Sequence, residues 1–590
     1  MRNSRQIRIL VKILYMLTIV IGICLLINRV RFGVELTDEA WYVAEPYIVS
    51  QGAVPYVNNW TQAPGFSLPL AFFFKIYVLV NGTEGIFLFS RILYVCWLVF
   101  VSFVSVYILG KNTPGITPYL TVFPLLFTCA QVNSMFDINY NTIGVIYLLP
   151  VLVLMIFVQE KQSKMKYGIS LLIAGLIMAR TIIGTPYTLL AWFILLVYCV
   201  KTKQWKKLCL FIAGNAVMAV IVVGGCCIGG GGIWNFINGM RAWLNDAAYF
   251  KIPAQHTRVG DVLYLISFCK PLLICFIVTL ILRIIRPWHD RLFYGFLIAF
   301  ILYGLCNAFL APIDGYSAGR IVKYLWFIPF IILFCGKLEE EKRLLAINIC
   351  ILNAIYFVVY LFASACNIYG FSGREYWLYI PSIFSILLMY YVMHNKIVAY
   401  CGLYIGLLVL GALLIRYAYS NVYRDQEINL LDTKVDYGVY KGCYTTVERA
   451  ESVKELEQYI RSVTEADDNV LFLDWASFGY VMTEANACTP TALDPMSYSY
   501  GVNDPKVMYD YFALSGRVPN KIIYIDHGRD EFLSIDNEWR FNEFVNDYYI
   551  LKDVFMTTNA IENRRYEVSY PLKASFLVKY YEIVDEETNM

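Results

Sequence analysis

Long apolar segments dominate the chain from its start to residue 417. The first runs from Ile9 to Ile27, and segments of this kind recur until Tyr417. A helix of about 18 or more apolar residues can cross the roughly 30 Å of hydrocarbon in a bilayer. The pattern therefore predicts a polytopic membrane protein with about thirteen transmembrane helices. These are expected near residues 9–27, 86–109, 116–132, 142–158, 167–180, 183–200, 208–228, 262–282, 292–312, 321–336, 344–365, 377–393 and 397–416.

A different pattern begins beyond Tyr417, where apolar positions follow the period of an amphipathic helix over residues 451–463. The apolar positions of this helix are Val453, Leu456, Ile460 and Val463. An apolar strand is predicted next, at residues 470–473. A helix at 506–515 and a second strand at 521–526 follow. Strands that alternate with helices predict a small α/β domain with a parallel or mixed sheet.

The composition and the charge distribution indicate a membrane region followed by a domain outside the bilayer. The chain is 59% hydrophobic and only 16% charged, whereas a soluble domain has about 25% charged residues. From Ser420 onward the net charge is −14, and before it the net charge is +17. We therefore divide the chain into a membrane region, 1–417, and an α/β domain, 418–590.

The positions of the basic residues predict the orientation, because cytoplasmic loops are enriched in lysine and arginine. The N-terminus is basic, and later basic clusters fall at 161–166, 201–207, 283–291 and 337–343. With about thirteen crossings, all of these clusters lie on the cytoplasmic side. The odd number of crossings then places the N-terminus in the cytoplasm and the C-terminal domain outside. The first helix is expected to remain as an uncleaved anchor.

Cysteine and histidine indicate no metal centre. Most of the 16 cysteines lie in apolar segments, where cysteine acts as a small hydrophobic residue. No spacing typical of metal ligands is present. With four histidines in 590 residues, a histidine-based metal site or catalytic triad is not expected. Cys443 and Cys488 both belong to the external domain, and the sequence leaves open whether they form a disulfide.

Carboxylates are concentrated at the predicted external face. Asp38 and Glu39 stand side by side just after the first apolar segment, and Asp137 lies in the second external loop. Ionised groups at a membrane face are costly and usually belong to a site. Scattered external arginines and lysines accompany them. This combination suits a phosphate-bearing lipid substrate, with cations for the phosphate and a carboxylate as the base.

The order of these motifs resembles the GT-C glycosyltransferases, in particular bacterial relatives of protein O-mannosyltransferases and of the lipid A aminoarabinose transferase. The resemblance spans most of residues 1–416 and includes an acidic pair in a short amphipathic helix after helix one. The matching pieces are Asp38-Glu39, Ala63-Pro64-Gly65-Phe66, Gly82-Thr83-Glu84 with Arg91, Asp137 followed by Asn139-Tyr140-Asn141, Ala174-Gly175-Leu176 to Gly184 and Pro186, and Arg320 with Lys323-Tyr324.

The resemblance implies a direct, inverting transfer of a sugar from a polyprenyl-phosphate donor to a glycan, lipid or protein acceptor. Asp38 would be the general base, and Asp137 would be a second acid near the acceptor. Glu39 points about 100° away from Asp38 on a helix, so we expect it to orient the loop or contact a cation. The residues that would bind the lipid phosphate or other parts of the substrate are Arg91, Arg180, Arg320, Lys323 and Tyr324. No nucleotide cofactor or nucleic-acid partner is expected, and a divalent metal at the acidic pair is left open.

Several alternatives stay open. Thr37 or Asp38 could simply cap an interfacial helix, and Asp137 could cap helix four. The glycines at 229–232 are read as an exit into a long loop at 233–261, whose aromatic residues could form an interfacial belt or a sugar pocket. At the level of function, the alternatives are a flippase for lipid-linked saccharides, a sensor or scaffold, and a glycan polymerase or ligase.

Overall fold

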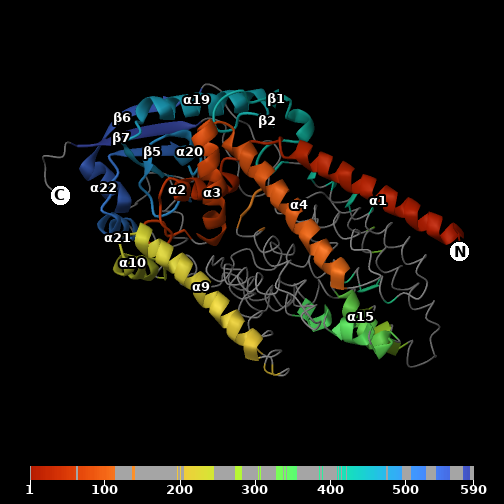
Figure 1. Cartoon of the computed structure of the whole chain (residues 1–590). Helices are drawn as coiled ribbons and strands as arrows, with labels where there is room; N and C mark the ends of the chain where they lie inside the picture. The colour runs from red at the N-terminus through yellow and green to blue at the C-terminus, as the bar shows by residue number, and fades with distance from the viewer. Residues whose placement is uncertain are drawn as a thin grey trace.

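The computed structural model describes residues 2–61, 64–112, 136–139, 142, 205–244, 327–336, 422–473, 476–493, 506–526, 540–557 and 576–584, with scattered positions between 196 and 419. The predicted crossings between residues 116 and 200 and most of those after 262 lie outside the described residues. Figure 1 shows long helices that extend from one sheet-bearing part of the molecule.

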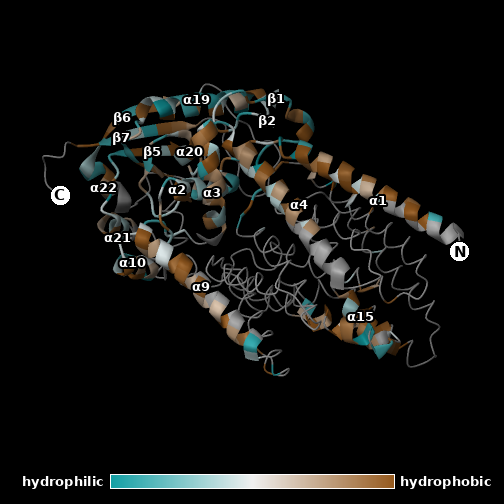
Figure 2. Cartoon of the chain, viewed as in Figure 1, coloured by the Kyte–Doolittle hydropathy of each residue, from teal (hydrophilic) through white to brown (hydrophobic). Residues whose placement is uncertain are grey.

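Long apolar helices form where the sequence predicts several of the crossings. Their bounds are α1 (Arg2–Arg29), α4 (Ile86–Asn112), α9 (Trp205–Gly229) and the shorter α15 (Ile328–Cys335). Figure 2 shows apolar residues along much of α1, α9 and α15 and more hydrophilic residues on the helices near the sheet. Within the described part of the chain, no single helix meets a combined test of length and hydropathy for a membrane span. The pair Ala219–Gly229 and Ile233–Arg241, bent by 99° at its break, meets that test together.

Two shorter helices follow α1. Helix α2 (Asp38–Ser50) begins at the acidic pair, as the sequence predicted, and is buried along most of its length. Helix α3 (Pro64–Asn81) packs against it. Aromatic edge-to-face contacts from Phe66 to both Trp41 and Tyr42 contribute to this packing.

The expected long loop at 233–261 is wrong in its first part. Residues Ile233–Leu244 form an amphipathic helix, α10, which packs against α21 (Lys506–Ser515). One face of α10 is apolar and closely packed: an added Cβ at Gly239 would lie 1.7 Å from the Tyr56 carbonyl oxygen. The glycine run at 229–232 therefore does not mark the start of a long loop, because α10 begins directly after it.

The C-terminal part contains a five-stranded mixed sheet. Its strand order is β4-β3-β5-β7-β6, with β4, β3 and β5 parallel and β7 antiparallel to both β5 and β6. The bounds are β3 (Asn469–Leu473), β4 (Asn486–Ala487), β5 (Lys521–Asp526), β6 (Tyr549–Met556) and β7 (Leu577–Ile583). The predicted strands at 470–473 and 521–526 are thus confirmed as β3 and β5.

The helices and short strands around this sheet are α19 (Val447–Val463), α20 (Gly479–Met482), α21, α22 (Arg540–Tyr548), a two-stranded ladder of β1 (Thr433–Lys434) and β2 (Tyr444–Thr445), and a 3₁₀ turn at Ile428–Leu430. The amphipathic prediction for α19 is confirmed, because Val453, Leu456 and Ile460 are buried. The helix is four residues longer at its start, where the Thr446 side chain accepts from the backbone N–H of Arg449.

A hydrophobic cluster of the described residues crosses the predicted boundary between the two regions. It runs from Tyr15 and Ile19 of α1 through α2 to Leu456 of α19 and Phe472 of β3. The first loop and the start of the C-terminal part are also joined by backbone contacts. Buried apolar surface on both sides means that the two parts stabilise each other.

Candidate functional site

The site is built on the loop between α1 and α2, which is held against the C-terminal part. Gly33 donates its N–H to the Tyr444 carbonyl at 2.8 Å, and Tyr444 donates to the Arg31 carbonyl at 2.7 Å. Gly33 has a φ of +103°, and a Cβ there would lie 2.1 Å from Cγ1 of Val422. Glycine is therefore required at this close approach, both for its backbone conformation and for space.

Glu35 holds the start of α2, a role that the sequence analysis missed. Its carboxylate accepts from the backbone N–H of Thr37 at 3.0 Å, from the Thr37 hydroxyl, and from the backbone N–H of Glu39 at 2.6 Å. Thr37 occupies the N-cap position of α2, one of the alternatives left open by the sequence, but its side chain makes no capping bond. Burial raises the pKa of Glu35 to about 7, against the opposing effect of Arg424.

Asp38 is the accessible carboxylate of the group. Its side chain is 24% exposed, whereas Glu35, Glu39 and Asp137 are between 0 and 3% exposed. The hydroxyl of Tyr423 donates to Oδ2 of Asp38 at 2.9 Å, and Nη1 of Arg424 lies 3.6 Å from the same oxygen. Asp38 is therefore both oriented by the protein and open to solvent.

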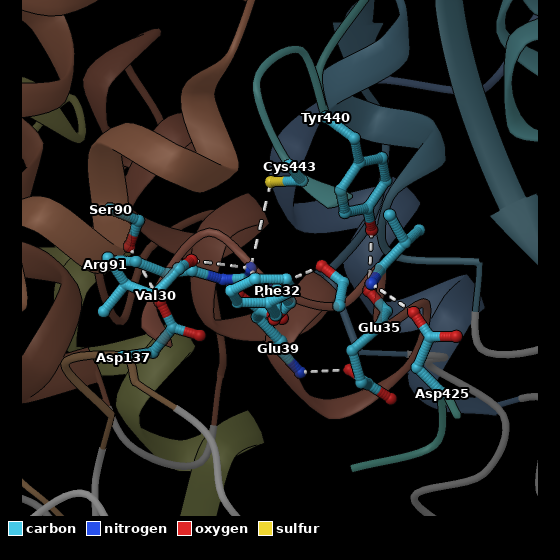
Figure 3. Close-up of polar contacts among 12 residues, drawn as sticks. Val30, Phe32, Glu35, Glu39, Ser90, Arg91, Asp137, Asp425, Tyr440 and Cys443 are labelled. Carbon is cyan, nitrogen blue, oxygen red and sulfur yellow. Dashed lines mark hydrogen bonds and ion pairs between the residues drawn. The ribbon is translucent and has the colours of Figure 1, made fainter. Parts of the chain in front are cut away.

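Glu39 forms a buried ion pair with Arg91 of α4, in agreement with the expectation that it contacts a cation (Figure 3). Nε of Arg91 donates to one carboxylate oxygen, and Nη2 donates to the other at 2.6 Å. The guanidinium also donates to the carbonyls of Val30 at 3.0 Å and Gly33 at 2.9 Å. Such a bidentate pair fixes α2 to α4 and to the first loop.

This geometry does not support the predicted role of Arg91 in substrate binding. The side chain is 3% exposed, and its donors contact Glu39 and backbone carbonyls. The Phe32 carbonyl and the Cys443 sulfur complete its surroundings. A guanidinium enclosed in this way has no free edge for a phosphate, so Arg91 supports the loop from inside.

Asp137 lies beside the ion pair and is completely buried (Figure 3). Its Oδ1 accepts from the Ser90 hydroxyl at 3.1 Å, while Oδ2 finds no donor among the described residues. Burial, followed by the negative charge of Glu39, raises the pKa of Asp137 well above its usual value. A protonated Asp137 would donate a hydrogen bond to Glu39 and so relieve the contact between two acceptors.

A second buried acid connects α2 to the C-terminal part. Oε1 of Glu45 accepts from the hydroxyl of Thr491 at 2.9 Å, the backbone N–H of Ala492 at 2.7 Å and the indole of Trp41 at 3.2 Å. Its Oε2 accepts from the Asn59 amide at 2.8 Å. Since four donors satisfy this carboxylate, it acts as a structural connection rather than as an accessible base.

The remaining predicted site residues are not placed. Arg180, Arg320, Lys323 and Tyr324 lie outside the described residues. The structure therefore brings together Asp38, Glu39, Arg91 and Asp137, and the phosphate-binding set stays a prediction.

Tyr423 and Arg424 are further site residues that the sequence did not indicate. For Glu35, the only signal in the sequence is its position shortly before the acidic pair. Tyr423 and Arg424 stood at the expected domain boundary. No local pattern marks two residues that contact a side chain 385 and 386 positions away.

The two cysteines left open by the sequence are free thiols in separate surroundings. Cys443 receives a contact from Nη1 of Arg91 at 3.8 Å, and Cys488 donates toward the Arg517 carbonyl at 3.5 Å. No cluster of three or more His, Cys, Asp or Glu side chains suited to a metal occurs in the described part of the chain.

Two solved structures resemble the chain over nearly its whole length. Both are crystal structures of ArnT from Cupriavidus metallidurans, one bound to undecaprenyl phosphate and one in the apo state. The first gives a TM-score of 0.42 at 13% identity and the second 0.40 at 11%, each over 96% of this chain and 97% of the other. ArnT is a lipid A aminoarabinose transferase, the enzyme class that the sequence motifs resemble.

No family model matches the chain, and neither does any curated protein. Similarity at this level carries no detail of the reaction. The function is therefore inferred from the arrangement of the site.

Proposed function

We propose that the chain is an integral membrane glycosyltransferase. It transfers a sugar from a polyprenyl-phosphate donor to an acceptor hydroxyl at the outer face of the cytoplasmic membrane, with inversion, and Asp38 is the general base. The membrane location and orientation rest on the apolar segments and on the distribution of basic residues. The reaction rests on the acidic site and on the resemblance of its motifs.

The observation that carries the proposal is the contrast between Asp38 and its neighbours. Glu39 is neutralised by Arg91, and Glu35 accepts from the start of α2. Asp137 faces Glu39 in the interior. Asp38 alone among these four acids combines solvent exposure with a fixed orientation. A general base needs both, because it must reach the proton that it removes.

The proposed chemistry is a single displacement. The acceptor oxygen forms a bond to the anomeric carbon of the donor sugar, while the bond from that carbon to the phosphate oxygen breaks. The bonding electrons leave with the phosphate, and the acceptor proton passes to Asp38. Arg180, Arg320, Lys323 and Tyr324 are the residues that we propose for binding the lipid phosphate, on the basis of the resemblance.

The test is turnover by the purified protein in detergent with a panel of hexosyl and pentosyl polyprenyl phosphates. The Asp38→Asn variant keeps the shape of the side chain but removes its basicity, so we expect at least a 100-fold loss of product. Glu84→Gln is the matched control. Glu84 is an exposed acid that pairs with Lys441 at 3.0 Å, and this variant should turn over normally.

Mass spectrometry of the product separates this function from its alternative. A new glycosidic bond that depends on Asp38 supports a transferase. A protein that moves lipid-linked sugars across vesicles without forming any such bond would be a flippase, and the proposal would then be wrong. Normal turnover by Asp38→Asn would reject Asp38 as the base.

A further inference from the structure

The segment that joins the two halves of the chain reaches into the candidate site. Tyr423 and Arg424 follow the end of the membrane region, and both contact Asp38. Arg424 adopts a φ of +54°, a left-handed conformation that is uncommon for a residue with a side chain. Strained conformations of this kind occur where the surrounding structure imposes them.

The surroundings do fix this segment. The Asp425 carboxylate accepts from the backbone N–H of Val34 and from the Thr445 hydroxyl, both at 2.8 Å. Arg449 donates from Nη1 to the carbonyls of Val34 at 2.7 Å and of Arg424 at 2.6 Å. These contacts are buried or partly buried, and they join the first loop, the connecting segment and α19. The positions of Tyr423 and Arg424 relative to Asp38 are therefore set by the fold.

Arg424 lies between two carboxylates. Its Nη1 is 3.7 Å from Oε1 of Glu35 and 3.6 Å from Oδ2 of Asp38, and it donates to the Thr37 hydroxyl. Its guanidinium carbon also lies 4.7 Å from the centroid of the Tyr423 ring. The cation thus reduces the repulsion between Glu35 and Asp38 and is itself held over the tyrosine.

Tyr423 orients the Asp38 carboxylate. Its hydroxyl donates to Oδ2 of Asp38, the same oxygen that lies near Arg424. Among the described residues, no contact engages Oδ1 of Asp38. Burial and the neighbouring Asp38 charge raise the pKa of Tyr423 well above its usual value, so the hydroxyl remains a donor. One carboxylate oxygen is therefore fixed by the protein, and the other is left to accept a proton.

We propose that Tyr423 and Arg424 are positioning residues for the Asp38 carboxylate, and that the catalytic site is incomplete without this connecting segment. The inference rests on the proposed function, since it assumes that Asp38 is the base. It adds that the acid-bearing loop alone does not make the site. The start of the C-terminal part supplies the groups that aim Oδ1 at the acceptor.

The first test is the Tyr423→Phe variant of the full-length protein, with steady-state kinetics on the best donor found in the panel. The variant removes one hydroxyl that donates to a charged acceptor. We expect kcat to fall roughly 10-fold or more, while KM for the lipid donor changes less than two-fold. Tyr459→Phe is the control, because Tyr459 donates to Asp553 at an exposed position away from the site.

A second pair of variants tests the cation. Arg424→Lys keeps the positive charge and should retain most of kcat. Arg424→Met leaves Glu35 and Asp38 facing each other without a cation and should lose most of kcat. If Arg424→Met does not fold, the kinetics of Tyr423→Phe and Arg424→Lys still test whether the two residues position Asp38. The inference is overturned if Tyr423→Phe keeps wild-type kcat, or if it changes only KM.

These outcomes are distinct from failure of the proposed function. Loss of turnover in Asp38→Asn together with normal kcat in Tyr423→Phe keeps the base and rejects the positioning role. Normal turnover in Asp38→Asn rejects the base, and with it the reason for positioning it.

Discussion

The buried pair of Glu39 and Arg91 gives the sharpest prediction about stability. In the Arg91→Met variant a flexible apolar side chain replaces the guanidinium. Glu39 would then lie in the interior without its partner, and the carbonyls of Val30 and Gly33 would lose their donor. Removing one partner of a buried ion pair costs about 3–5 kcal/mol. We expect a loss of this size in the free energy of unfolding.

The measurement is denaturant or thermal unfolding of the purified protein in detergent, with a pair of reference variants. The ion pair between Lys441 and Glu84 has a similar length, 3.0 Å, but both side chains are 49% exposed. Lys441→Met should therefore cost less than about 1 kcal/mol. The double variant Glu39→Gln with Arg91→Met removes the uncompensated charge, so it should recover part of the loss.

The reasoning would be refuted if Arg91→Met destabilised the protein no more than Lys441→Met. It would also be refuted if the double variant were no more stable than Arg91→Met alone. In either case the buried pair would not stabilise the first loop against α4.

Three further predictions concern the same loop. Asp137→Asn should keep the stability of the parent because its amide can donate to Glu39, whereas Asp137→Ala should lose about 1–3 kcal/mol, as measured by the same unfolding assay. The pKa of Glu35 is raised from 4.5 to about 7 by folding, so its contribution to stability is present below about pH 4.5 and is lost as the pH rises through 7. This loss is at most about 3 kcal/mol. In a pH series of melting temperatures, Glu35→Gln should therefore show a smaller decline over this pH range than the parent protein. Gly33→Ala should lower the melting temperature and the turnover together, because a Cβ would collide with Val422; a variant with parental values in both assays would contradict the close approach.

Much of the secondary structure could be predicted from local patterns. The apolar run that contains Ile9 and Ile27 became α1, and the spacing of Val453, Leu456 and Ile460 predicted the buried face of α19. These patterns are local, since the period of a helix or strand is visible within about 11–18 residues. The prediction of a loop after the glycines at 229–232 was wrong, because the amphipathic pattern of α10 outweighs them and its packing against α21 stabilises the helix.

The sequence by itself also indicated Asp38 and Glu39 as candidate site residues, because two adjacent charges after a long apolar segment are costly unless they are used. Their separate roles were decided only by the tertiary structure. Arg91 lies 52 positions from Glu39, and Tyr423 lies 385 positions from Asp38. Ion pairs and hydrogen bonds depend on distance in space, and a buried carboxylate and an exposed one have the same letter in a sequence. Folding alone makes Glu39 a buried partner of Arg91 and leaves the Asp38 carboxylate partly exposed.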